Sequence, residues 1–256
     1  MPSPHLPAAI AYDLDGVVVS STGVHYAAWK ELFVDEIGLP AFPMEHYDKY
    51  VSGRQRSEGF IAYLIYSADE LGDEKFRKIA ADPEKVKHYT DQKQERVHSL
   101  ISDPAVEITV FDDTVSSIKE WRARGVKTTI ASASENTPLL LARVGLTDLF
   151  DALAYGKSAL INGRKVPLRS KPAPDAFIKS VEQIGVAPED CIGVEDAGKG
   201  IEAINAAGMM SIAIERTPNP DLRNAQPDLL LHNFAETSVD ELVEKFAEWK
   251  TAKRPH

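Results

Sequence analysis

Residues 8–16 read AAIAYDLDG, a short apolar run that ends in two aspartates and a glycine. The apolar run predicts a buried strand, and Gly16 lets the chain turn away from it. Asp13 and Asp15 are two residues apart, so an extended segment points both carboxylates the same way. One carboxylate of such a pair can attack phosphorus while the other transfers a proton. The simpler alternative is that both aspartates belong to a solvated turn at the end of the strand.

Strand-like and helical segments alternate in the second part of the chain. The predicted strands are residues 126–131, 152–155, 191–194, 211–214 and 229–231, and the predicted helices are residues 115–124, 138–144, 174–184 and 198–207. This alternation predicts an α/β fold, a Rossmann-like parallel sheet core with right-handed crossovers and helices on both faces. Ligands of such sheets bind beyond the carboxyl ends of the strands.

The segment that precedes Asp103-Pro104 has a different character. It shows helical patterns and a high density of charge, without a clear β-rich run. Val24–Ile37, for example, carries apolar residues at helical spacing and is closed by Gly38. We therefore predict two domains: an α/β core formed by residues 1–21 and 104–256, and an all-helical cap, residues 22–103, inserted into the first crossover.

Two further polar segments lie beyond predicted strands. Ser132-Ala133-Ser134 offers hydroxyls and amides at a strand-to-helix turn, which suits phosphate oxygens, although a simple helix N-cap has the same composition. Lys171 lies in SKPAPD, residues 170–175, where prolines stiffen the backbone at a helix start. A lysine on such a turn is a candidate for a fixed cation, whereas most lysines are solvated surface charges.

Glu195 and Asp196 follow the predicted strand at residues 191–194. Two adjacent carboxylates beside Asp13 and Asp15 require a cation, because like charges at close range raise each other's pKa. Oxygen ligands suit Mg²⁺. The alternative is a pair of acids favoured at a helix start by the helix dipole.

Four motifs taken in chain order resemble those of the haloacid-dehalogenase superfamily, and within it the β-phosphoglucomutase branch. They are DLDGV (13–17), SAS (132–134), SKPAPD (170–175) and GVED (193–196). The resemblance implies that Asp13 is the phosphorylated nucleophile and Asp15 the general acid/base. It also implies that Ser132 contacts the transferring phosphoryl group and that Lys171 clamps the phosphate.

The same resemblance implies a Mg²⁺ site. Asp13, the backbone carbonyl of Asp15 and Asp196 would be its direct ligands, and Glu195 would support the metal directly or through water. A sugar 1,6-bisphosphate is implied as an activator, since such a compound phosphorylates the nucleophile of a mutase of this kind.

His25 and Trp29 are four residues apart and share one face of a predicted helix. The pattern His-x-x-x-Trp-Lys resembles the β-phosphoglucomutase branch, which implies that His25 contacts the general acid/base carboxyl and couples its position to cap closure. Trp29 is accordingly predicted to be substrate-binding. A structural histidine is the alternative.

GRQRS, residues 53–57, resembles the cap loop that binds the distal phosphate of a sugar bisphosphate. Gly53, Arg54 and Arg56 are the predicted substrate-binding residues there, because a guanidinium suits bidentate phosphate recognition. A basic surface turn is the alternative. Ser52 stands where the resemblance leads us to expect a lysine, and Arg54 compensates from the other side of the glycine.

Ser134 and Asn136 complete the predicted substrate-binding set. Between them Glu135 takes a position that is lysine in the mutase pattern.

Two local features are also unusual. Phe111-Asp112-Asp113 replaces a common Pro-Gly before a core helix. Asn162-Gly163 between apolar flanks predicts a two-residue hairpin.

Composition limits the classes of partner. The net charge of −10 over 256 residues argues against nucleic acid or an anionic membrane, but not against a small anionic substrate. A single cysteine, Cys191, allows no intramolecular disulfide. With no apparent signal peptide or transmembrane run, a cytoplasmic location is expected. A monomer is the expected state, with a homodimer as the alternative.

The function predicted from these features is Mg²⁺-dependent phosphoryl transfer through an aspartyl-phosphate on Asp13. A sugar phosphate is the expected small-molecule partner, and conversion of β-glucose 1-phosphate to glucose 6-phosphate is the leading hypothesis. His25 and Arg56 favour this mutase, whereas Ser52 and Glu135 favour a sugar-phosphate phosphatase with the same core. A non-catalytic sugar-phosphate-binding protein is the third hypothesis, which the intact core motifs argue against.

Overall fold

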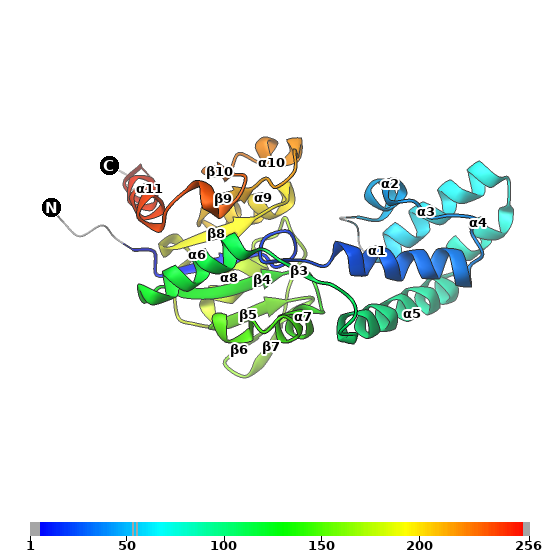
Figure 1. Cartoon of the computed structure of the whole chain (residues 1–256), viewed down its shortest axis with the longest axis horizontal. Helices are drawn as coiled ribbons and strands as arrows, with labels where there is room; N and C mark the ends of the chain where they lie inside the picture. Colours follow the sequence, from blue (N-terminus) through cyan, green and yellow to red (C-terminus); the bar gives the residue numbers. More distant parts are fainter. Residues whose placement is uncertain (1–5, 53, 55, 253–256) are drawn as a thin grey trace. The chain divides into compact units, whose positions relative to one another are not determined.

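A computed structural model describes residues 6–52, 54 and 56–252 (Figure 1). The chain divides into two compact units, one formed by Met1–Ser20 with Thr109–His256 and the other by Ser21–Ile108. The predicted boundaries followed residues 21 and 103, whereas this division follows Ser20 and Ile108. A short antiparallel ribbon, β2 (Val19–Ser20) with β3 (Thr109–Val110), lies where the chain leaves the first unit and returns to it.

The first unit is built on an eight-stranded sheet of order β10-β9-β8-β1-β4-β5-β6-β7. Strands β10, β9, β8, β1, β4 and β5 are parallel to their neighbours in this order, and β6 and β7 extend the sheet antiparallel. Their bounds are β1 (Ala9–Tyr12), β4 (Lys127–Ser132), β5 (Ala152–Tyr155), β6 (Ser158–Ile161), β7 (Arg164–Pro167), β8 (Cys191–Glu195), β9 (Met210–Ile214) and β10 (Leu229–Leu231).

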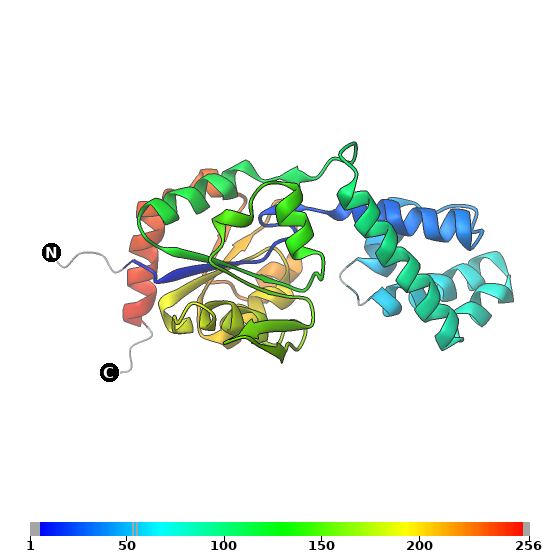
Figure 2. The ribbon, with the colours of Figure 1, turned by 90° about the horizontal axis from the view of Figure 1, so that it is seen from below.

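Helices cover both faces of this sheet, as predicted (Figure 2). On one face α8 and α9 pack their apolar side chains against Ala9 and Ala11 of β1. The opposite face carries Tyr12, whose ring meets Phe234 at 6.5 Å between centroids, and is covered by α6 and α11. All four residues of β1 are buried, which explains its continuous apolar sequence. The helix bounds are α6 (Asp112–Ala123), α7 (Thr137–Arg143), α8 (Asp175–Glu182), α9 (Gly198–Ala207), α10 (Pro220–Asn224) and α11 (Val239–Ala252), with short 3₁₀ turns η3 (Thr147–Leu149), η4 (Pro188–Asp190) and η5 (Phe234–Glu236).

The predicted hairpin is confirmed. Asn162 and Gly163 join β6 to β7 with φ values of 49° and 74°. Two consecutive positive φ angles are what a tight hairpin turn of this type requires, and asparagine and glycine adopt them at low cost.

Helices are the only regular secondary structure among the described residues of the second unit. Its core is a set of stacked and edge-on aromatic rings, in which Phe33 lies 4.7 Å from Tyr63 and 5.7 Å from Phe60 between centroids. The helix predicted at Val24–Ile37 is present, but it passes from α-helix to π-helix after Glu31. The elements are α1 (Thr22–Glu31), η1 (Leu32–Glu36), α2 (Met44–His46), η2 (Tyr47–Val51), α3 (Arg56–Leu71), α4 (Glu74–Ala80) and α5 (Pro83–Ser102).

Across the described residues of both units, no helix is long and apolar enough to cross a membrane.

Candidate active site

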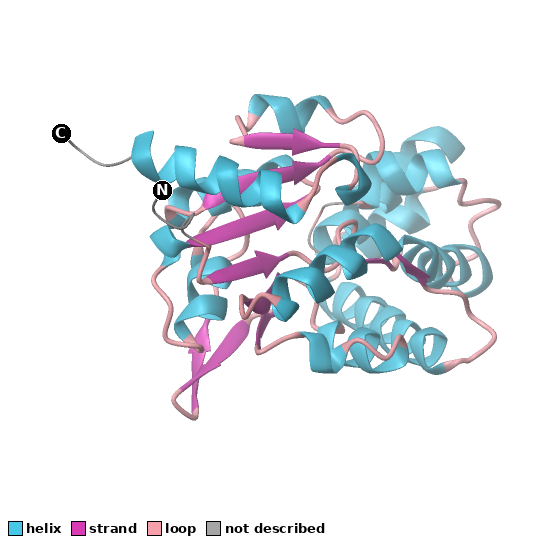
Figure 3. Cartoon of the chain, turned by 60° about the vertical axis from the view of Figure 1, so that its left-hand side comes forward, coloured by secondary structure: helices cyan, strands magenta, loops and turns pink. Residues whose placement is uncertain are grey.

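Three predicted site residues lie at the ends of neighbouring strands. Ser132 is the last residue of β4, Glu195 is the last of β8, and Asp13 directly follows β1, which lies between them. The register places Tyr12 of β1 beside residues near the ends of both neighbours. Because the parallel strands point the same way (Figure 3), these side chains emerge at one edge of the sheet.

Lys171 joins two of the carboxylates. Its Nζ donates to Asp13 Oδ1 and to Glu195 Oε1, both at 2.5 Å, and lies 4.9 Å from the centroid of the Phe177 ring. The Lys171 side chain is only 13% exposed, which separates it from a solvated surface lysine. The turn before α8 therefore holds an ammonium group beside Asp13 and Glu195.

Asp13, Glu195 and Asp196 form an acidic cluster. One carboxylate oxygen from each lies within 4.8 Å of the others. Glu195 Oε2 accepts hydrogen bonds from the amides of Asp196 at 2.8 Å and Ala197 at 2.9 Å, which fixes the orientation of this carboxylate. An all-oxygen donor set of this kind fits Mg²⁺.

Two glycines make room for these carboxylates. A Cβ built on Gly16 would lie 1.8 Å from Asp196 Oδ2, and one built on Gly200 would lie 1.9 Å from Glu195 Oε1. Gly16 also has φ of +82°, a conformation that other residues seldom adopt. Any larger residue at either position would displace a candidate metal ligand.

Burial raises the pKa of Asp13 to about 7, against the opposing effect of Lys171; Glu195 and Asp15 raise it further. Burial, together with Glu195 and Asp13, also holds the pKa of Asp196 well above its usual range. Burial alone would lower the pKa of Lys171, but Asp13 and Glu195 more than offset this and raise it. One ammonium group thus does not balance the carboxylates, so the site has the electrostatic demand of a divalent cation.

The loop after β4 holds the predicted phosphate-binding hydroxyls. Ser132 Oγ accepts a hydrogen bond from the Ser134 amide at 3.1 Å, and Ser134 Oγ accepts one from the Asn136 amide at 3.2 Å. Asn136 is buried and precedes α7. Glu135 packs against Gly156, where a Cβ would lie 2.8 Å from Glu135 Cγ.

The helical unit has a polar cluster of its own. His25 Nδ1 lies 2.7 Å from Lys93 Nζ, which in turn lies 5.0 Å from the centroid of the Trp29 ring. Burial lowers the pKa of His25 to about 3, and the positive charges of Lys93 and Arg56 lower it in the same direction. His25 is therefore a neutral imidazole at ordinary pH.

The other predicted residues of this unit have different surroundings. The Arg56 guanidinium donates to Gln94 Oε1 at 2.6 Å, and Arg54 is exposed. Trp29 is only 3% exposed and belongs to the aromatic core, so its substrate-binding role stays a prediction. The prediction for Gly53 lies outside the described residues.

Lys93 is a charged residue of this cluster that belongs to none of the sequence motifs described above. The buried positions of α5 are Val86, Thr90, Lys93, Val97 and Ile101, so the lysine occupies the inward stripe of the helix. Its position four residues before Val97 and seven after Val86 was the available signal.

Paired carboxylates, a buried lysine and a hydroxyl-bearing loop at the carboxyl edge of a parallel sheet are groups that an enzyme site for phosphoryl transfer needs. The family model of the haloacid dehalogenase-like hydrolases matches residues 7–208. The chain belongs to this family, as the sequence motifs predicted.

The individual relatives include β-phosphoglucomutases and a sugar-phosphate phosphatase. The chain is 30% identical over 250 residues to a β-phosphoglucomutase of Mycobacterium tuberculosis, which covers 92% of this chain and 90% of the relative. It is 28% identical over 209 residues to a fructose-1-phosphate phosphatase of Escherichia coli, covering 81% and 96% of the two chains. The crystal structure of a β-phosphoglucomutase from Clostridium difficile is similar with a TM-score of 0.73 and 25% identity, covering 96% of this chain and 100% of the other.

Proposed function

We propose that this protein is a Mg²⁺-dependent phosphomutase that interconverts β-glucose 1-phosphate and glucose 6-phosphate through an aspartyl-phosphate on Asp13. The observation that carries the proposal is the contact of Asp13 with Lys171 inside the acidic cluster. Similarity to β-phosphoglucomutases along more than nine-tenths of the chain supports the choice of reaction.

In the first half-reaction Asp13 attacks phosphorus. A bond forms between an Asp13 carboxylate oxygen and phosphorus, the bond from phosphorus to the sugar oxygen breaks, and Asp15 gives its proton to that oxygen. Lys171 and the hydroxyl of Ser132 stabilise the charge on the phosphoryl oxygens. The donor in this step is a sugar bisphosphate, which leaves as a sugar monophosphate. Transfer of the phosphoryl group from Asp13 to the free hydroxyl of the isomeric sugar monophosphate reverses these steps, with Asp15 as the base, and forms the bisphosphate again.

Asp13, Asp196, Glu195 and the Asp15 carbonyl would hold Mg²⁺. When bound, the metal neutralises negative charge on the phosphoryl group. The chain's own contribution is to fix the carboxylates: Glu195 is anchored by two backbone amides and by Lys171, and Asp196 lies against Gly16.

The helical unit supplies the second binding function in this proposal. Arg56 and Lys93 are cations beside a neutral His25, which suits the binding of a second anionic group such as the distal phosphate of a sugar bisphosphate. Ser134 and Asn136 of the core are proposed to contact the same substrate. We propose that His25 contacts the Asp15 carboxyl during turnover and that Trp29 supports the substrate site from the aromatic core.

A phosphatase acting on a sugar phosphate is the second candidate. It is favoured by Glu135, which places a carboxylate where the mutase pattern has a lysine, and by the similarity to a fructose-1-phosphate phosphatase. In this case water, instead of a sugar hydroxyl, attacks the aspartyl-phosphate.

One experiment separates the two candidates. The protein is incubated with β-glucose 1-phosphate, Mg²⁺ and a trace of glucose 1,6-bisphosphate, and the products are followed by phosphorus NMR. Growth of glucose 6-phosphate without free phosphate supports the mutase, and it should stop when EDTA removes the metal. Growth of inorganic phosphate alone refutes the mutase in favour of the phosphatase. If no product forms from this sugar or from an aryl phosphate, phosphoryl transfer itself is refuted.

A further inference from the structure

Arg216 lies two residues beyond β9, yet its side chain reaches the turn that carries the catalytic aspartates. Its Nε donates to the carbonyl oxygen of Gly16 at 3.3 Å, and its Nη2 lies 3.5 Å from the carbonyl oxygen of Val17. Both carbonyls belong to the turn that directly follows Asp15. A single guanidinium therefore contacts the turn from a segment 200 residues further along the chain.

The same guanidinium is itself held in place. Its Nη2 donates to Asp113 Oδ2 at 3.1 Å and to Thr114 Oγ1 at 2.9 Å, and its Cζ lies 3.8 Å from the centroid of the Phe111 ring. Two of these residues, Phe111 and Asp113, belong to the segment that replaces the common Pro-Gly. The side chains of Phe111, Asp113 and Thr114, at the start of α6, thus hold the Arg216 guanidinium in place.

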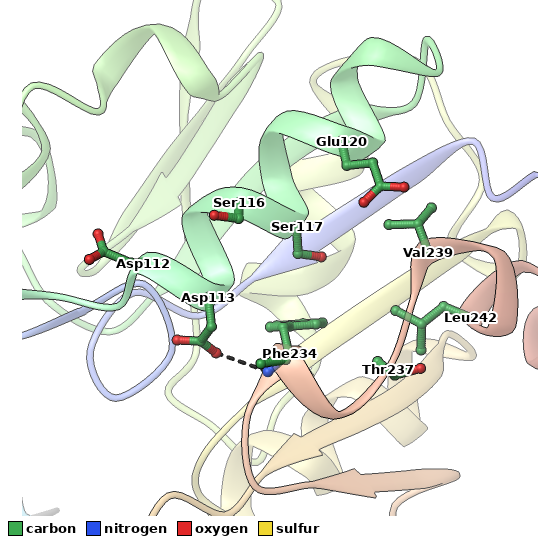
Figure 4. Close-up of a pocket in the computed structure, with 10 residues that line it drawn as sticks. Asp112, Asp113, Ser116, Ser117, Glu120, Phe234, Thr237, Val239 and Leu242 are labelled. Atoms are coloured by element: carbon green, nitrogen blue, oxygen red, sulfur yellow. Dashed lines mark hydrogen bonds between the residues drawn. The ribbon is translucent and has the colours of Figure 1, made fainter.

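Asp113 is fixed in turn from a third direction. Its Oδ2 accepts a hydrogen bond from the Phe234 amide at 2.9 Å, as the dashed line in Figure 4 shows, at the wall of a cavity of about 310 Å³. Burial alone would raise the pKa of Asp113, but the Phe234 amide and Arg216 outweigh it and lower the pKa. The carboxylate is therefore charged when it meets the guanidinium.

The turn that Arg216 contacts is in direct contact with its surroundings on several sides. Gly16 lies between Asp15 and Val17, its amide donates to the Val19 carbonyl at 2.8 Å, and it packs directly on the Asp196 carboxylate. The backbone that Arg216 contacts is therefore bonded directly to Asp15 and lies against Asp196.

We propose that Arg216, seated on Asp113, is a positioning residue that sets the Asp15–Gly16 turn and so aims the Asp15 carboxyl for proton transfer. The proposal rests on the proposed phosphoryl transfer. Arg216 acts through the backbone carbonyls of Gly16 and Val17, and the side chains to which it donates, Asp113 and Thr114, lie outside the acidic cluster. An arginine suits this position because its planar fork can donate to a carboxylate, a hydroxyl and backbone carbonyls at the same time, whereas an ammonium group can satisfy only some of these acceptors in that geometry.

The test compares two substrates in the full-length protein. An aryl phosphate with a good leaving group needs little help from a general acid, whereas a hexose phosphate needs its leaving oxygen protonated. We expect Arg216→Met to lower kcat about 100-fold with the hexose phosphate but less than about threefold with the aryl phosphate. Arg216→Lys should recover part of the loss, and Asp113→Asn, which keeps an acceptor for Phe234, should give a smaller loss of the same selectivity.

Arg124→Met is the matched control. Arg124 donates to Asp240 at 2.6 Å and to Glu120 at 2.7 Å, so the change removes an arginine–carboxylate pair of the same unit that does not involve the Asp15 turn. We expect this variant to retain the kcat of the wild type with both substrates. Equal losses with both substrates in Arg216→Met, or no loss with either, would overturn the proposal.

The rate of amide hydrogen exchange in residues 13–20 tests, independently of turnover, whether Arg216 fixes the Asp15–Gly16 turn. Arg216→Met should speed exchange of the Gly16 and Val19 amides relative to Arg124→Met, with both proteins shown to be folded by their thermal melting. Unchanged exchange would refute the positioning. A wild-type protein that turns over neither substrate would refute the proposed function instead, and the exchange comparison would still decide whether Arg216 fixes the turn.

Discussion

Each of the two units buries a lysine beside a residue expected to take part in the reaction, and the two lysines have opposite surroundings. In the sheet-containing unit Lys171 contacts the carboxylates of Asp13 and Glu195. In the helical unit Lys93 contacts the neutral imidazole of His25 and the face of the Trp29 ring. The first ammonium lies among an excess of negative charge, whereas the second adds to a group of cations.

The opposite surroundings of the two lysines suit the two units to different kinds of ligand. A buried charge is costly unless an opposite charge or a metal compensates it. The acidic cluster around Lys171 is therefore suited to a divalent cation and the phosphoryl group that the cation accompanies. The cluster around Lys93 and Arg56 is suited to an anion, as the proposed recognition of a distal phosphate requires.

The largest effect is expected at Asp13. Asp13→Asn keeps the size of the side chain but removes the nucleophile, so turnover of an aryl phosphate should fall by at least about 10⁴-fold. Asp148→Asn changes an exposed aspartate of the same unit and should keep full activity. Steady-state assays at saturating Mg²⁺ make the comparison. Substantial residual activity in Asp13→Asn would show that another group attacks phosphorus.

The contrast between the lysines can be tested through stability. Lys171→Met leaves Asp13 and Glu195 buried without their cation, so the free energy of unfolding in metal-free buffer should fall by about 3 to 5 kcal/mol. Mg²⁺ should restore part of this loss, because it supplies positive charge to the same carboxylates. Lys179→Met removes a surface ion pair with Glu182 on α8 and should cost less than about 1 kcal/mol.

Lys93→Met sharpens the same comparison in the helical unit. The methionine keeps the apolar stem and can pack on the Trp29 ring, so the unfolding free energy should change less than in Lys171→Met, and Mg²⁺ should have no specific effect on it. Chemical denaturation with and without Mg²⁺ measures both variants. A metal-dependent recovery in Lys93→Met would contradict the assignment of the acidic cluster as the metal site.

The sequence was sufficient for the core site because topology does most of the positioning. Parallel strands share a carboxyl edge, so polar residues after β1, β4 and β8 had to meet there once the strands were recognised. The hairpin at Asn162-Gly163 was predictable for a local reason, the φ angles of its two residues.

Long side chains that reach across the fold were not predictable in the same way. Arg216 contacts Gly16 from a loop whose position depends on the packing of β9, and nothing in its immediate sequence indicates that contact. Lys93 had a detectable signal in its place on the inward stripe of α5, but its partner His25 depends on how α1 packs against that helix. The π-helical turn after Glu31 also shows that periodicity alone does not determine the hydrogen-bonding pattern of a helix.

A smaller effect is expected from the depressed pKa of His25. Its ordinary pKa is near 6.5 and its pKa in the folded protein is about 3, so below pH 6.5 the unfolded chain binds a proton that the folded chain does not. This contribution to stability is complete above pH 6.5 and is lost as the pH falls toward 3. Between pH 6.5 and 4.5 it should reduce the unfolding free energy by about 2 kcal/mol.

His25→Gln tests this linkage. The variant has no histidine at this position and should lose less stability in acid than the wild type does. The difference in unfolding free energy between the two proteins should therefore change by about 2 kcal/mol between pH 6.5 and 4.5. Titrating groups common to both proteins cancel in the difference. His88→Gln, which makes the same substitution at an exposed histidine of the same unit, is the control. A flat difference for His25→Gln would mean that its environment does not exclude the proton.

The smallest effect, and the most specific for the substrate, concerns Arg56. If this guanidinium binds a distal phosphate, Arg56→Met should raise KM for a sugar bisphosphate about tenfold while kcat for an aryl phosphate, which has no second phosphate, stays unchanged. Arg96→Met removes another arginine of the helical unit, one paired with Glu31, and should leave both values unaltered. Equal losses with both substrates would place Arg56 in the structure of the unit instead of in recognition. The comparison therefore decides whether the cationic cluster selects the substrate or only supports the fold that presents it.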